Sequence, residues 1–160
     1  MQKSGRSAYR LYFPMQKPVL QRTIMSEAAA VTEAQIAELV QVFYDRARLD
    51  DDLGPVFNNA VGDWDHHLAI VTDFWSNALL GTKRYTGHPF PVHIRLPITR
   101  EHFGQWLALF REAAEEILPP ETAKLAIGRA EFMAKSFRAG LFPFDPVVPS
   151  SATRSKDTPA

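Results

Sequence analysis

Residues 64–78 constrain the fold most strongly, because their apolar side chains recur at the spacing of one helix face. They return every three or four positions, which is the period of an α-helix. His67 is therefore predicted to point inward, whereas His66, about 100° away around the helix, is predicted to face solvent. The full stripe is Trp64, His67, Leu68, Val71, Phe74, Trp75 and Ala78. An imidazole on such a stripe is either a packed core residue or part of a pocket, and the stripe alone leaves both interpretations open.

The composition indicates a single globular domain without disulfides. A chain of 160 residues, 46% of them hydrophobic and 22% charged, can bury one hydrophobic core. The formal net charge of zero argues against nucleic acid or a membrane surface as the main partner. The absence of cysteine excludes disulfides, thiolate zinc sites and cysteine nucleophiles. No apolar run approaches the length of a membrane span, and we expect a cytoplasmic protein.

The two ends of the chain differ in composition from its centre. Residues 1–31 are predicted to be a flexible basic extension, because the first 26 positions hold five basic residues and no acidic one. Interruptions by Arg10, Pro14 and Lys17 leave this segment without the apolar core of a secretory signal, and organelle targeting is the competing interpretation. The remainder is mildly acidic, with 13 basic and 18 acidic residues. Residues 143–160 are rich in proline, serine and threonine and are predicted to be a disordered tail.

The centre of the chain is predicted to begin with two long helices. Thr32 followed by Gln35 is a capping-box pattern, and it predicts a helix from there to about Leu49. The helix that carries the opening stripe is predicted from about residue 62 to residue 80. Between the two helices, residues 50–57 are predicted to be a solvated turn followed by a short apolar return to the core.

Two further helices are predicted in the second half of an all-α domain that spans residues 32–142. Glycine and proline make residues 81–91 irregular, and residues 92–97 have room for one helical turn. Thr99 is predicted to cap a third long helix that the proline pair at 119–120 ends. A fourth helix is predicted from about residue 121 to residue 140, with small residues on its apolar face.

A set of short motifs runs through this domain in order. They are Phe43-Tyr44, Leu53-Gly54-Pro55-Val56-Phe57, Trp64-x-x-His67, Phe74-Trp75, Tyr85-x-Gly87-x-Pro89, His93-x-x-Leu96-Pro97 and His102-Phe103-x-x-Trp106-Leu107. In order and spacing the set resembles the group III truncated haemoglobins, the two-over-two globins of bacteria, over about residues 32–141. Groups I and II of this family usually carry paired glycines at helix corners. No two glycines are adjacent in this chain, so the resemblance is to group III. The resemblance implies a truncated globin fold, a two-over-two helical sandwich around a haem.

The resemblance implies that His93 is the proximal ligand of a haem b iron. Haem iron in globins needs one neutral imidazole, and His93 lies on a short segment between a loop and a helix. On the residues alone, His102 and His88 compete for this role. The offset of His102 from Phe103 and Trp106 favours a capping or surface position for it.

The resemblance also implies the composition of the pocket. Tyr44, His67 and Trp106 are assigned to the distal side, where tyrosine and tryptophan each bring one polar hydrogen. The walls around the macrocycle are Phe57, Val71, Phe74 and Trp75. Lys83, Arg84 and Arg95 are candidates for contact with the haem propionates, and solvation is the alternative for each of these loop side chains.

The function implied by the resemblance is tight binding of O2, and of NO and CO, at the haem iron. A hydrogen bond to a charged acceptor contributes about 1.5 to 3 kcal/mol, so two donors would slow oxygen release by orders of magnitude. Slow release weighs against bulk oxygen transport. It favours a redox role such as NO dioxygenation or peroxide reduction. Such a role needs electrons from a reductase, which the sequence does not identify. We expect the protein itself to be a monomer or a dimer.

Other classes of protein stay open at this point. A haem-based gas sensor would share the fold and the pocket, and a globin-like binding module without a cofactor would share the fold alone. A hydrolase could hold zinc on His66, His67 and His93 with a carboxylate. Adjacent histidines point to different faces of a helix, which is poor geometry for a shared metal.

Overall fold

The computed structural model describes residues 30–143, and this part of the chain is helical without strands. Its helices are α2 (Glu33–Leu49), α3 (Leu53–Ala60), α4 (Trp64–Leu80), α5 (Phe90–His93), α6 (Arg100–Ile117) and α7 (Pro120–Leu141). The all-α prediction is confirmed. No helix in the described range combines the length and the apolar character needed to cross a membrane. The predictions for residues 1–29 and 144–160 lie outside the described residues.

Side-chain caps fix where the long helices begin. At α2 the Thr32 hydroxyl accepts from the backbone N–H of Gln35 at 3.2 Å, while Oε1 of Gln35 accepts from the backbone N–H of Thr32 at 3.0 Å. This is the predicted capping box. At α4 the carboxylate of Asp63 accepts from the backbone N–H of His66 at 3.0 Å, so the helix begins two residues later than the sequence predicts.

Residues 53–60 form helix α3, where the sequence analysis predicts a turn followed by a short apolar segment. The Asp50 carboxylate accepts from the backbone N–H groups of Asp52 and Leu53, at 3.0 and 2.8 Å, and so satisfies amides at the start of α3. Gly54 lets the new helix start against the end of α2, because a Cβ atom at this position would lie 2.7 Å from the carbonyl oxygen of Arg48. The three consecutive aspartates at residues 50–52 therefore lead directly into a helix, with Asp50 satisfying its first amides.

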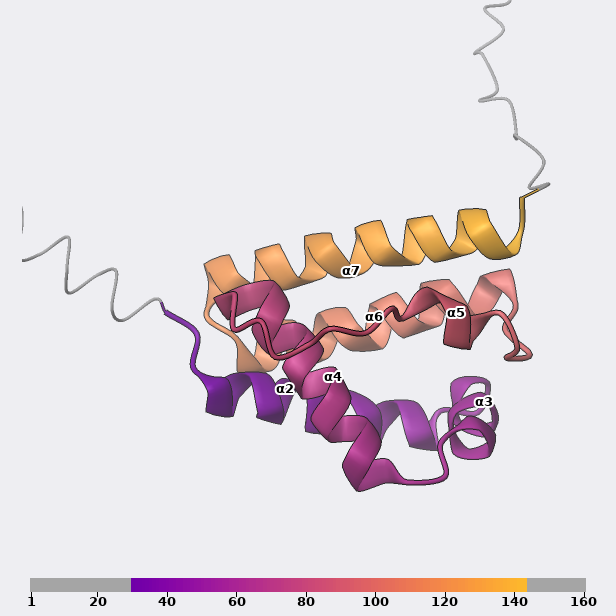
Figure 1. Cartoon of the computed structure of the whole chain (residues 1–160), viewed down its shortest axis with the longest axis horizontal. Helices are drawn as coiled ribbons and strands as arrows, with labels where there is room; N and C mark the ends of the chain where they lie inside the picture. The colour runs from indigo at the N-terminus through magenta and orange to yellow at the C-terminus, as the bar shows by residue number, and fades with distance from the viewer. Residues whose placement is uncertain (1–29, 144–160) are drawn as a thin grey trace, which may run out of the picture. The chain divides into compact units, whose positions relative to one another are not determined.

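The long helices pack as two pairs, the two-over-two arrangement that the resemblance implies. Helices α6 and α7 lie side by side and antiparallel, and α4 crosses α2 beneath them (Figure 1). Contacts between α2 and α6 and between α4 and α7 join the pairs. Helices α6 and α7 are in contact and both bury small residues, which suit close packing. The buried alanines of these helices are Ala113, Ala114, Ala123, Ala126, Ala130 and Ala134.

Three aromatic rings form a stack through the core. Phe110 of α6 stacks on Trp75 of α4, with ring centroids 4.6 Å apart, and on Trp106 one turn earlier in α6, at 5.5 Å. Phe110 and Trp75 are buried, whereas Trp106 is half-buried. Such pairs add about 0.5 to 1.5 kcal/mol beyond the area they bury. The stack fixes the relative positions of α4 and α6, the helices that carry two walls of the cavity described below.

The close approach at Gly54 leads to a test of the α2–α3 corner. We expect Gly54→Ala to lower the free energy of unfolding by about 1 to 3 kcal/mol, because the new methyl group would meet the Arg48 backbone. Chemical denaturation measures the change. Gly128→Ala is the matched control, because nothing lies within 4 Å of a Cβ atom there and alanine favours the helix by about 1 kcal/mol. Equal effects of the two substitutions would contradict the explanation.

Candidate functional site

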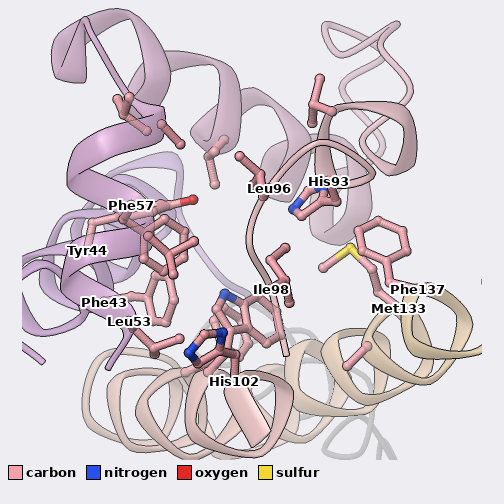
Figure 2. A pocket seen from close by; sticks show the side chains of 18 of the residues that line it. Phe43, Tyr44, Leu53, Phe57, His93, Leu96, Ile98, His102, Met133 and Phe137 are labelled. Carbon is pink, nitrogen blue, oxygen red and sulfur yellow. The ribbon is translucent and has the colours of Figure 1, made fainter. Parts of the chain in front are cut away.

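A cavity of about 430 Å³ lies between the helix pairs and α5 (Figure 2). This volume is within the range of about 300 to 1,000 Å³ that is usual for cofactor and ligand sites. Most of its lining is aromatic or aliphatic. The structure brings together eight of the residues that the sequence assigns to the site, namely Tyr44, Phe57, His67, Val71, Phe74, Trp75, His93 and Trp106. In Figure 2, Tyr44 and Phe57 lie across the cavity from His93 and Phe137.

One ring nitrogen of His93 is available to bind a metal ion. Its Nδ1 donates a hydrogen bond to the carbonyl oxygen of Pro89 at 2.6 Å. A carbonyl can only accept, so in the neutral ring the hydrogen sits on Nδ1 and Nε2 carries the lone pair. Burial lowers the pKa of His93, and the bond to Pro89 opposes this shift. The neutral imidazole with a free Nε2 is the form that binds transition metals.

Packing against α7 holds the short helix that carries His93. Phe90, the first residue of α5, lies over Gly140, where a Cβ atom would be 2.6 Å from the Phe90 ring. The Phe137 ring contacts both ends of α5, with centroids 5.3 Å from Phe90 and 4.8 Å from His93. Because a helix of four residues has no stability of its own, these contacts set where the imidazole lies.

Tyr44 and His67 form the polar part of the opposite side of the cavity. The Tyr44 hydroxyl and Nε2 of His67 are hydrogen-bonded at 2.9 Å, and the tautomer of the ring decides which of them donates. Burial raises the pKa of Tyr44, so its hydroxyl stays protonated. Burial, followed by the charges of His93 and His66, lowers the pKa of His67. Both groups are therefore neutral hydrogen-bonding groups at neutral pH.

The other histidines occupy different positions. His66 is exposed, as predicted, and so is His88. Nδ1 of His102 accepts from the backbone N–H of Thr99 at 3.1 Å, which confirms a capping role at the start of α6. The same half-buried ring also lines the cavity, below Leu53 in Figure 2. Among residues 30–143, no group of three histidine, aspartate or glutamate side chains could hold a metal ion, so the zinc alternative has no site there.

The basic residues named for the propionates differ in their surroundings. Arg84 forms ion pairs with Glu33 and Asp73, at 2.8 and 2.7 Å, and all three nitrogens of its guanidinium donate to these two carboxylates. Lys83 and Arg95 are exposed, and neither has an ion pair within the described residues. Arg95 lies two residues after His93, on the turn that follows α5.

Sequence reasoning did not assign several residues that line the cavity. Leu53 lies on the unpredicted helix α3, while Leu96 and Ile98 lie on the turn after α5. Met133 and Phe137 lie on α7, which corresponds to the predicted fourth helix. The helical period indicates that such residues face inward, but it does not distinguish a wall of a cavity from a packed core.

Comparisons with known proteins agree with this geometry. The bacterial-like globin family matches residues 29–139. The chain is 36% identical over 119 residues to a group 3 truncated hemoglobin of Campylobacter jejuni, which covers 71% of this chain and 94% of that protein. It is 30% identical to a group 2 truncated hemoglobin of Bacillus subtilis, over 66% of this chain and 83% of that protein. A crystal structure of a group III truncated hemoglobin from Campylobacter jejuni superposes with a TM-score of 0.68 at 36% identity, covering 72% of this chain and 95% of that chain.

The lowered pKa of His67 predicts how the stability of the protein, with its cavity empty, depends on pH. The folded state holds this imidazole neutral, so the unfolded state binds the proton first as the pH falls below about 6.5. We expect the free energy of unfolding to fall between pH 7.5 and pH 5.5. In His67→Gln the fall should be smaller, because glutamine can bond Tyr44 but does not titrate.

Urea denaturation at the two pH values measures this difference. His66→Gln is the matched control, since His66 is the adjacent residue and is exposed. A pH dependence that is the same in both variants would show that the buried imidazole does not cause it.

Proposed function

This chain belongs to the bacterial-like globin family, among the group III truncated haemoglobins, and on that premise we propose that its cavity binds haem b and small gases. His93 is the proposed iron ligand. The observation that carries the proposal is the bond from Nδ1 of His93 to Pro89, because it leaves Nε2 free at the wall of a cavity of suitable volume. The apolar walls, to which Phe57, Val71, Phe74 and Trp75 contribute, suit a flat hydrophobic macrocycle.

When bound, haem supplies an iron with one open coordination position for O2, NO or CO and with access to redox chemistry. The residues opposite His93 determine how a ligand in that space is held. Tyr44 can donate to a ligand when His67 donates to the Tyr44 oxygen, so the hydroxyl and imidazole act together. Trp106 adds an indole N–H from α6, a group that can only donate.

Two donors in a mostly apolar cavity favour retention of a polarised ligand. Each bond to a charged acceptor contributes about 1.5 to 3 kcal/mol, and about 1.4 kcal/mol is tenfold in affinity. Such retention is unsuited to bulk oxygen delivery. We therefore favour a redox role such as NO dioxygenation or peroxide reduction, with electrons supplied by a reductase. Of the three basic residues considered for the haem carboxylates, the exposed cations Lys83 and Arg95 are proposed to meet them. Arg84 is the weaker candidate, because its guanidinium is already paired with Glu33 and Asp73.

The assignment of His93 is tested by titrating the purified protein with haem. We expect a sharp Soret band at a ratio of one haem to one chain, and its loss or strong weakening in His93→Ala. His102→Ala and His88→Ala serve as controls, because they remove the competing imidazoles and should leave the band in place. A band that survives in His93→Ala and disappears in either control would overturn the assignment.

The roles of Tyr44 and Trp106 are tested by the oxygen dissociation rate of the ferrous protein. We expect Tyr44→Phe and Trp106→Phe each to speed release about tenfold or more, because each removes one donor to the ligand. Stopped-flow replacement of oxygen by CO measures the rate. Val71→Ala changes the same cavity without removing a donor and should have a smaller effect. Rates equal to that of the natural protein would contradict tight, hydrogen-bonded oxygen binding.

A further inference from the structure

The connection between α4 and α5 has little backbone hydrogen bonding of its own. The N–H groups of Gly81 and Lys83 bond the backbone and the side chain of Asn77, at 3.0 Å each. Within the described part of the chain, residues 82–88 take part in no backbone–backbone hydrogen bond. The next fixed point is α5, which carries His93. Side chains must therefore hold this connection in place.

Arg84 supplies the charged contacts that hold the connection. Its Nη1 and Nη2 donate to Oε1 and Oε2 of Glu33, at 3.0 and 2.8 Å, and its Nε donates to Oδ1 of Asp73 at 2.7 Å. Oε2 of Glu33 also accepts from the hydroxyl of Ser76 at 2.6 Å, and Ser76 is fully buried. Glu33 lies in the first turn of α2, whereas Asp73 and Ser76 belong to α4. We call these four residues the Arg84 cluster.

We propose that Arg84 is a positioning residue for His93, fixing the connection that delivers α5 to the cavity. The inference rests on the proposed function, in which His93 holds the haem iron. One end of the connection is held by the Arg84 cluster and by Tyr85, whose ring lies 5.3 Å from that of Phe74. The other end is held by Phe90 against α7. Arg84 thereby determines how often α5 leaves the cavity.

This role differs from a general contribution to stability. Exposed ion pairs contribute modestly to the free energy of unfolding, and contribute most where the geometry is bidentate, as it is for Arg84 and Glu33. Replacing Arg84 should therefore lower global stability only by a small amount, which denaturation measures beside haem release. A segment without backbone hydrogen bonds can open locally while the long helices stay folded. Loss of Arg84 should favour this local opening, which frees His93 from the iron. The predicted signature is faster haem loss without a matching loss of global stability.

The chain offers a closely matched control. Arg111 of α6 pairs with Glu131 of α7, so this ion pair joins two other helices. The Arg111 side chain is 47% exposed, against 46% for Arg84. Arg84→Gln and Arg111→Gln therefore remove the same charge at similar exposure, although Arg84 has two carboxylate partners and Arg111 has one. Arg84→Lys keeps the charge but loses the planar, bidentate geometry. It should give an intermediate result.

The experiment uses the haem-loaded protein and measures the rate of haem transfer to excess apomyoglobin at low salt. We expect Arg84→Gln to raise the rate about fivefold, Arg84→Lys to raise it less and Arg111→Gln to leave it unchanged. The difference between Arg84→Gln and the natural protein should shrink at high salt, because exposed ion pairs are screened. Resonance Raman spectra of the ferrous protein should show a shifted or broadened iron–histidine band in Arg84→Gln, a smaller change in Arg84→Lys and none in Arg111→Gln.

The outcomes separate this inference from the proposed function. If the natural protein retains haem and Arg84→Gln releases it at the natural rate, the positioning role is overturned while the proposed function stands. Equal effects of Arg84→Gln and Arg111→Gln on haem release would also overturn it, as would an effect fully explained by lower global stability. A natural protein that binds no haem would overturn the proposed function together with this inference.

Discussion

The hydrogen bond from Nδ1 of His93 to the Pro89 carbonyl is the interaction on which the proposed site depends. It assigns the hydrogen to one ring nitrogen and leaves the other as a metal-binding lone pair. The two residues are four positions apart, so the bond requires that the single turn of α5 is formed. A turn of this length needs support from outside. That support comes from the ring of Phe137, which contacts His93, and from the packing of Phe90 on Gly140. In our proposal the Arg84 cluster adds to it.

The opposite side of the cavity depends on contacts between the helix pairs. Tyr44 of α2 is hydrogen-bonded to His67 of α4, and these two helices are in contact. The stack of Trp75, Phe110 and Trp106 fixes α4 against α6. The few polar groups in the cavity are therefore held by buried aromatic packing. Fixed donors in an apolar surrounding act more strongly on a polarised ligand than the same groups in water.

Much of the fold follows from the local sequence, whereas the site depends on contacts between distant residues. Helical spacing predicts α4 and the inward position of His67, and the pair Thr32 and Gln35 predicts the start of α2. Helix α3 was missed because side-chain acceptors on Asp50 and a close approach at Gly54 stabilise it, and neither has a periodic signal. The His67 partner of Tyr44 and the Glu33 partner of Arg84 lie 23 and 51 residues away, beyond the reach of any local pattern. The choice of His93 over His102 came from the resemblance, since spacing alone left both open.

The measurement that tests this account most directly is a crystal structure of the haem-loaded protein. The account predicts iron bound to Nε2 of His93, with the hydrogen bond from Nδ1 to Pro89 retained and with Tyr44 and Trp106 on the opposite side of the haem. Iron bound to His102 or His88 in place of His93, or a haem outside the cavity between the helix pairs, would contradict it.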